Sequence, residues 1–184
     1  MTRYPLLVFV VLLTSCASLG TKTLYNADNK GEVRKIGFSK LDGNSIVIRI
    51  FPKTDSIFRS TFVNTVNKFN LPTPFFWDNE ISIEKADTGA ISRICKENNL
   101  DGLIVTKLKF INTSYSVYFV PIGKSYDTQV EMKLFSNNGN LLYGVKYNTM
   151  NGNSYLDLPT ADRTVHDGIV GAINKIAKGM GWKK

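Results

Sequence analysis

The stretch YDTQVEMKLFSNNGNLLYGVKYN, residues 126–148, decides the fold that the sequence predicts. In its first half apolar residues occupy every second position from Val130 to Leu134, and charged or polar residues lie between them. Such alternation is typical of a half-buried strand. The Asn-Asn-Gly-Asn sequence at residues 137–140 predicts a turn, after which residues 141–147 repeat the alternation. We therefore expect an antiparallel hairpin with one buried face and one solvated face.

Three helices are predicted outside this hairpin. Apolar residues recur every three or four positions over residues 55–69, over residues 84–99 and from about Thr160 towards the C-terminus. This spacing places them on one side of a helix. We expect each helix to bury that side against a sheet.

Further strands are predicted on the N-terminal side of the hairpin. Residues 33–39 and 45–51 have strand character, and Asp42-Gly43-Asn44 between them predicts a second hairpin. Residues 103–105, Leu-Ile-Val, are apolar on both sides of a strand and predict a central position. The fold class we expect is α+β, with a mainly antiparallel sheet of about five strands and about three helices packed on one face.

Composition limits the classes of function. The chain has 184 residues and is 43% hydrophobic and 21% charged, which fits one globular domain. Two cysteines and one histidine do not suffice for a disulfide scaffold or a four-ligand zinc site. We find no sequence motif of a nucleophile elbow or a phosphate-binding loop. We therefore expect a noncatalytic protein without a cofactor or a metal.

The excess of positively charged residues is not accompanied by a nucleic-acid-binding motif. The formal net charge is +8, and no zinc-finger spacing or aromatic-basic signature accompanies it. We expect no nucleic-acid partner. Anionic lipid headgroups or an acidic protein surface fit the charge better.

The N-terminus, MTRYPLLVFVVLLTSC at residues 1–16, has the form of a secretion signal. Arg3 supplies the positive charge, and eight apolar residues follow from Leu6 to Leu13. That run is shorter than the roughly 20 residues that cross a bilayer. Removing residues 1–15 removes one positive charge, Arg3, and lowers the net charge from +8 to +7.

The segment Leu13-Thr14-Ser15-Cys16 resembles the cleavage box of bacterial lipoproteins. The resemblance implies that residues 1–15 are removed and that Cys16 receives a diacylglycerol and an N-acyl chain such as palmitate, which anchors it in the lipid bilayer. Residues 16–31 would then form the acylated cysteine and a flexible tether, and residues 32–184 one globular domain. Ala17 and Ser18, in place of an aspartate, favour the outer membrane, with the domain facing the periplasm. The alternatives are an ordinary secretory signal peptide and a buried N-terminal strand.

Residues 91–108, ISRICKENNLDGLIVTKL, resemble a second group of envelope proteins. In this group, which includes the TolB N-terminal domain, the penicillin-binding-protein activator lipoproteins and the curli secretion lipoprotein, a helix ends just before a similar apolar strand. The resemblance implies a noncatalytic role in binding or assembly. We therefore expect an envelope protein that binds a protein or cell-wall partner; the alternatives are a small-ligand carrier or envelope hydrolase, and a protomer of a secretion or envelope assembly.

The segment at residues 112–125 joins two predicted strands and is rich in aromatic residues. As a loop it is long for a hairpin, and its Tyr115, Tyr118 and Phe119 are candidate partner contacts. In the alternative interpretation, Val117 and Phe119 extend a strand and pack on the core.

Four other residues could carry chemistry. We expect Cys95 to be a small buried apolar residue rather than a nucleophile paired with His166. His166 is expected on the surface beside acidic residues. Asp127 and Glu131 are predicted to lie on the solvated face of their strand, near lysines.

Overall fold

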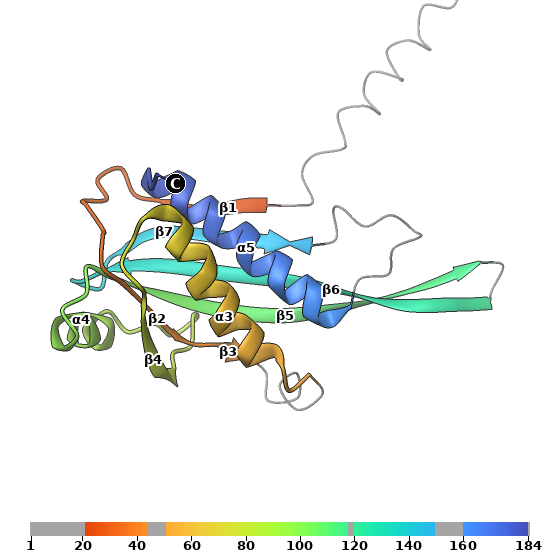
Figure 1. Cartoon of the computed structure of the whole chain (residues 1–184). Coiled ribbons are helices and arrows are strands. Elements are labelled where there is room, and N and C mark those ends of the chain that lie inside the picture. Colours follow the sequence, from red (N-terminus) through yellow and green to blue (C-terminus); the bar gives the residue numbers. More distant parts are fainter. Residues whose placement is uncertain (1–20, 44–50, 118–119, 150–159, 184) are drawn as a thin grey trace, which may run out of the picture.

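The computed structural model describes residues 21–43, 51–117, 120–149 and 160–183 (Figure 1). The strands are β1 (Thr21–Asn26), β2 (Ile36–Lys40), β3 (Asp42–Gly43), β4 (Phe75–Glu80), β5 (Gly102–Val117), β6 (Val120–Ser136) and β7 (Leu141–Asn148). The helices are α3 (Thr54–Val66), α4 (Thr88–Glu97) and α5 (Ala161–Met180), and a 3-10 turn at Asn67–Phe69 follows α3. α4 and α5 thus lie within their predicted segments, and α3 begins one residue before its own.

All seven strands belong to one sheet, in the order β1-β7-β6-β5-β2-β4, with β3 also beside β5. Neighbours are antiparallel from β1 to β5, whereas β2 and β3 run parallel to β5, and β4 runs parallel to β2. The expected mainly antiparallel sheet of about five strands is therefore wrong, because the sheet is mixed and has seven strands.

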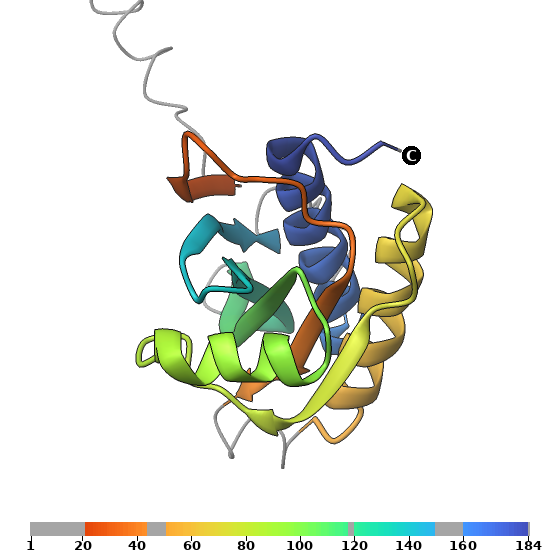
Figure 2. The same ribbon diagram turned by 90° about the vertical axis from the view of Figure 1, so that its left-hand side faces the viewer.

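The helices cover both faces of the sheet. α3 and α5 lie side by side on one face, and α4 lies on the other (Figure 2). The chain passes through α3 from β3 outward to β4 and through α4 back across the sheet to β5. Crossovers between parallel strands are right-handed, so an outward and a returning crossover put their helices on opposite faces. The expectation of three helices on one face is wrong for this reason.

The sheet separates two cores. In the larger core, between the sheet and the α3–α5 pair, Phe38 of β2 stacks on Phe62 of α3 with ring centroids 4.2 Å apart. The smaller core lies under α4. β5 contributes to both because successive side chains point to opposite faces: Ile104 packs in the larger core and Val105 in the smaller. The prediction of a central strand with both faces covered at residues 103–105 is confirmed.

The antiparallel hairpin predicted for residues 126–148 is confirmed. β6 pairs antiparallel with β7, from Gln129 opposite Asn148 to Phe135 opposite Leu141. Val130, Met132 and Leu134 are fully buried beneath α5. The predicted buried face of this strand is therefore the observed one.

Two N-terminal expectations differ from the structure. Asp42-Gly43 is not a turn: it forms β3, which continues beside β5 where β2 ends. Residues 44–50, most of the second strand predicted there, lie outside the described residues. Residues 21–26, expected within the flexible tether, form the edge strand β1, which pairs with β7.

Candidate functional site

A two-stranded arm extends from the sheet beyond the rest of the protein (Figure 1). The pairing of β3 with β5 ends at Leu108, and the pairing of β7 with β6 begins at Gln129. Beyond these positions, β5 and β6 pair only with each other within the described part of the chain. We call residues 109–117 of β5 and 120–128 of β6 the arm. At about 3.3 Å per residue it is roughly 30 Å long.

The arm replaces the long loop expected at residues 112–125. Asn112 lies opposite Tyr126, and the pairing continues to Val117 opposite Val120, with a register shift after Tyr115. The loop interpretation is therefore wrong for the described residues, and Val117 extends a strand as the alternative predicted. Phe119 lies outside the described residues, and the packing of Val117 and Phe119 on the core stays a prediction. Strand propensity accounts for the extension, because serine, threonine and tyrosine in this segment are compatible with a two-stranded ribbon.

The candidate site residues are only partly described. Tyr115 lies in β5 opposite Gly123, within the arm. Tyr118 and Phe119, at the tip between the two strands, and Cys16 lie outside the described residues. The structure thus places one of the three candidate contact residues in the arm, and the other two remain predictions.

Aromatic and hydroxyl contacts fix the root of the arm to the body. The ring of Phe51, just before α3, lies 4.8 Å from that of Phe110 and 5.2 Å from that of Tyr126. The hydroxyl of Thr128 donates a 2.8 Å hydrogen bond to the hydroxyl of Thr164 in α5. The arm therefore leaves the body from a defined position.

The sheet face that carries α4 also carries a group of charged residues on β5, β6 and β7. The Lys107 ammonium lies 2.7 Å from the Glu84 carboxylate, and its hydrogen bond and charge lower the pKa of Glu84. Glu131 lies 3.8 Å from both Lys133 and Lys146, as its predicted place on a solvated face requires. These partly exposed pairs contribute little to stability.

Asp127 departs from the prediction. It was expected on the solvated face with Glu131, but it is only 2% exposed. It lies opposite Ile111, where the arm meets the sheet. Its burial belongs to the root of the arm rather than to a catalytic pair of carboxylates.

An open hollow of about 670 Å³ lies at the C-terminal end of α5. Residues 31–34, 69–72 and 180–183 line it, with Trp182 and Phe69 among them and an exposed Arg34–Glu32 ion pair at 2.7 Å. The apolar residues here continue the larger core to the surface. The charged groups that line the hollow are exposed, so they orient a ligand weakly.

Cys95 and His166 lie on opposite sides of the sheet. Cys95 is buried under α4, and burial raises the pKa of its thiol to about 11. His166 is exposed on α5, with Nδ1 3.0 Å from the Asp167 carboxylate. The interpretation of Cys95 as a buried apolar residue is confirmed, and a dyad of these two residues is sterically impossible.

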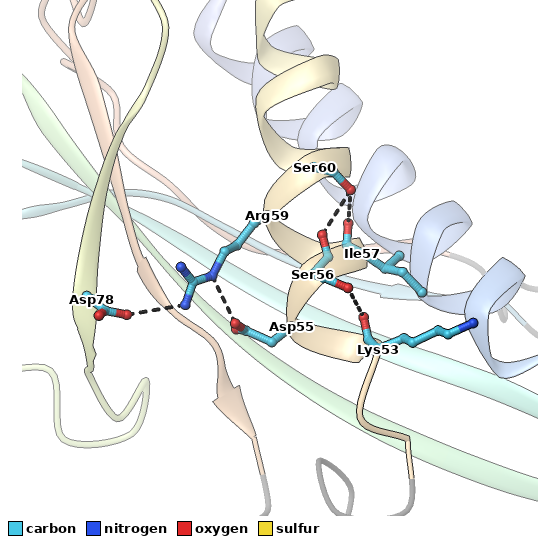
Figure 3. A network of polar contacts seen from close by, with 7 residues as sticks. All are labelled: Lys53, Asp55, Ser56, Ile57, Arg59, Ser60 and Asp78. Atoms are coloured by element: carbon cyan, nitrogen blue, oxygen red, sulfur yellow. Dashed lines mark hydrogen bonds and ion pairs between the residues drawn. The ribbon is translucent and has the colours of Figure 1, made fainter.

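A polar network links helix α3 to strand β4 (Figure 3). The Arg59 guanidinium donates to Asp55 at 2.9 Å and to Asp78 of β4 at 3.2 Å, and it lies 3.8 Å from the ring centre of Phe76. These contacts hold the edge strand β4 against α3.

The described residues contain neither a membrane-spanning helix nor a cluster of metal ligands. None of the helices there is long and apolar enough to cross a membrane. In the same residues, no three histidine, cysteine, aspartate or glutamate side chains gather in a way that could hold a metal ion.

Comparison with solved structures identifies a similar fold. The PelC dodecamer from Paraburkholderia phytofirmans superposes with a TM-score of 0.52 at 9% identity, over 89% of this chain and 97% of that chain. The chain shares the PelC fold. A point variant of the PelC dodecamer gives a TM-score of 0.53 at 11% identity, over 89% of this chain and 98% of that chain.

The other comparisons gave a weaker structural similarity or no match. Lipoprotein GNA1162 from Neisseria meningitidis reaches a TM-score of only 0.38 at 10% identity, over 78% of this chain and 98% of that chain. No protein-family model and no curated protein matches the sequence.

Sequence reasoning missed the length of the arm and the hollow beside α5. The arm had a usable signal: residues 103–117 contain no glycine or proline that would end a strand. The hollow had none, because its lining comes from three segments that are distant in sequence.

Proposed function

We propose that this protein is a noncatalytic lipoprotein of the bacterial envelope, anchored through an acylated Cys16, and that the arm binds a partner protein in an envelope assembly. The observation that carries the proposal is the two-stranded arm, which projects from a body whose root contacts hold it in place. Projecting strands offer backbone groups for pairing with another chain.

The leader supports the anchor, and β1 adds a constraint on its geometry. β1 begins at Thr21, so four residues separate it from Cys16. An extended chain of this length spans roughly 18 Å. An acylated Cys16 would therefore keep the sheet edge close to the membrane surface. We propose the outer membrane, with the domain facing the periplasm.

The position of the one described thiol supports a noncatalytic role. Cys95 is buried and protonated at neutral pH, and the sheet separates it from His166. The fold shared with a protein that forms a dodecamer supports an assembly role.

The anchor is tested by Cys16→Ala. We expect the substitution to abolish metabolic labelling with palmitate and to release the protein from the membrane fraction. Labelling that persists in the Cys16→Ala variant would overturn the proposed anchor. The Ser15→Ala variant is the matched control, because a small residue still precedes the cysteine.

Binding by the arm is tested at its tip. We expect Tyr118→Ser with Phe119→Ser to leave the melting temperature unchanged and to reduce recovery of the partner from native envelopes at least tenfold. Tyr25→Ser is the control, because Tyr25 is a 45% exposed aromatic residue on the body. A large loss of melting temperature in the tip variant would show that these residues belong to the core instead.

A further inference from the structure

We propose that the edge of the sheet formed by β1 and β7 lies on the surface of the lipid bilayer and binds anionic phospholipid headgroups. This inference rests on the proposed acylation of Cys16 and adds which face of the body meets the membrane. The contact is made by Lys22, Leu24 and Tyr25 of β1 and by Lys146 of β7, which we call the edge patch.

A β-bulge places the two apolar residues of the edge patch on one face of the sheet. Thr23 lies opposite Val145. Tyr25 lies opposite the preceding residue of β7, Gly144, so Leu24 is an extra residue in β1. A Cβ atom at Gly144 would lie 3.4 Å from the Cβ atom of Leu24 and 3.5 Å from that of Tyr25. Both side chains therefore start on the face to which a side chain at Gly144 would point, and both are exposed there.

The same face carries an excess of positive charge. Lys22 lies directly opposite Lys146, and Lys146 lies two residues after Gly144 in β7. Residues two apart in a strand point to the same face, so both lysines lie beside the two apolar side chains. Lys133 lies opposite Gly144, and Glu131 lies 3.8 Å from both Lys133 and Lys146. Three lysines thus surround one glutamate.

Two opposed lysines can bind an anion. Like charges directly opposite each other destabilise a sheet, and a phosphate group between the two ammonium groups replaces this repulsion with two attractions. Beside them, leucine can insert among acyl chains, and tyrosine can place its ring at the level of the headgroups. A free phosphate ion would use only the lysines. The combination of charged and apolar side chains therefore fits the surface of a bilayer that contains anionic lipid.

The proposed anchor brings the edge patch to the bilayer. Thr21, at the start of β1, lies within roughly 18 Å of an acylated Cys16, and the edge patch begins one residue later. At this distance the effective concentration of lipid is high, so a weak contact suffices. Five of the six residues of β1 are exposed, whereas α4 packs on β5 and the end of β6, away from β1 (Figure 2). Because the acyl chains hold the protein independently, the Tyr25→Ser variant stays on the membrane.

The test is fluorescence quenching with the full acylated protein in lipid vesicles. A Leu24→Cys variant carries the dye NBD at residue 24, and buried Cys95 stays unlabelled in the folded protein. The vesicles contain phosphatidylcholine with or without phosphatidylglycerol, and in both a small fraction of the lipid carries a nitroxide on its headgroup. We expect at least threefold stronger quenching with phosphatidylglycerol, because bound headgroups hold residue 24 at the bilayer surface.

Two charge variants with the same dye test whether the edge patch itself makes the contact. Lys22→Glu should lower the quenching in anionic vesicles to the level in neutral vesicles. This substitution removes a like-charge contact from the sheet, so unfolding does not explain the loss. Lys68→Glu is the matched control, because Lys68 is exposed just after α3, in the layer on the other face of the sheet. We expect the control to be quenched as strongly as the parent.

The outcomes separate this inference from the proposed anchor. A protein recovered with neither kind of vesicle would overturn the anchor, and this inference with it. A protein recovered with both kinds, whose dye is quenched equally in both, would overturn headgroup binding and retain the anchor. An equal loss of quenching in Lys22→Glu and Lys68→Glu would show that net charge alone attracts the body, and it would overturn the edge patch as the site.

Discussion

Asp101 and Gly102 join three parts of the sheet at the start of β5. The Asp101 carboxylate accepts hydrogen bonds from the backbone N–H groups of Arg34 at 3.0 Å and Lys35 at 2.7 Å. A Cβ atom at Gly102 would lie 2.7 Å from the carbonyl oxygen of Phe135. The Asp-Gly pair at residues 101–102 thus has a structural role in this chain.

We expect Asp101→Ala to lower the free energy of unfolding by about 2 kcal/mol, because hydrogen bonds to a charged group are worth 1.5–3 kcal/mol. Asp101→Asn retains an oxygen acceptor and should cost about half as much. Urea unfolding at pH 7 measures both. Equal stability of the alanine variant and the wild type would show that water replaces the carboxylate at this position.

Cys95 is expected to react with maleimide only when the protein unfolds. Its folded pKa of about 11 lies above the ordinary thiol value of about 8.5, so the thiol form is favoured by folding. This contribution to stability is complete below about pH 8.5 and is lost as the pH rises towards 11. Labelling of the acylated protein at pH 7.5 checks the reactivity, with the exposed Ser56→Cys variant as a rapidly labelled control.

At the scale of elements, the spacing of apolar residues within one segment was sufficient to predict which face of that helix or strand is buried. Ile169 and Ile173 of α5 and Val130 of β6 lie on the faces that their spacing predicted. Pairing partners were not predictable in this way. Asp42-Gly43 has turn chemistry, but β5 offers it a parallel strand, and this tertiary pairing overrides the local preference. The arm was read as a loop because its strands exceed the usual length of five to six residues.

The pairing of β1 with β7 contains a like-charge contact that can be removed. Lys22 lies directly opposite Lys146, and like charges opposite one another destabilise a sheet. We expect Lys22→Glu to raise the free energy of unfolding by about 0.5 kcal/mol, measured by urea unfolding at low salt. The control is Lys85→Glu, an exposed residue between β4 and α4 with the same charge change. A gain no larger than that of the control would show that the two ammonium groups already avoid each other.

At the scale of the whole molecule, β5 and β6 pass through two environments. Near Ile104, β5 has strand partners on both sides and a core on each face. Beyond Leu108 the same strand continues into the arm. The three helices bury the first half of β5 and the second half of β6, which lie side by side in the body. The molecule therefore combines a well-packed body and a two-stranded extension in one continuous sheet.

Amide hydrogen exchange should follow this division. We expect the amides of residues 103–106 and 130–134 to exchange only on global unfolding, because residues 103–106 are buried and the apolar residues of 130–134 pack beneath α5. The amides of residues 109–117 in the arm should exchange at least a hundredfold faster, because a two-stranded ribbon opens locally at little cost. Equal protection along the whole of β5 would show that the arm is as stable as the body.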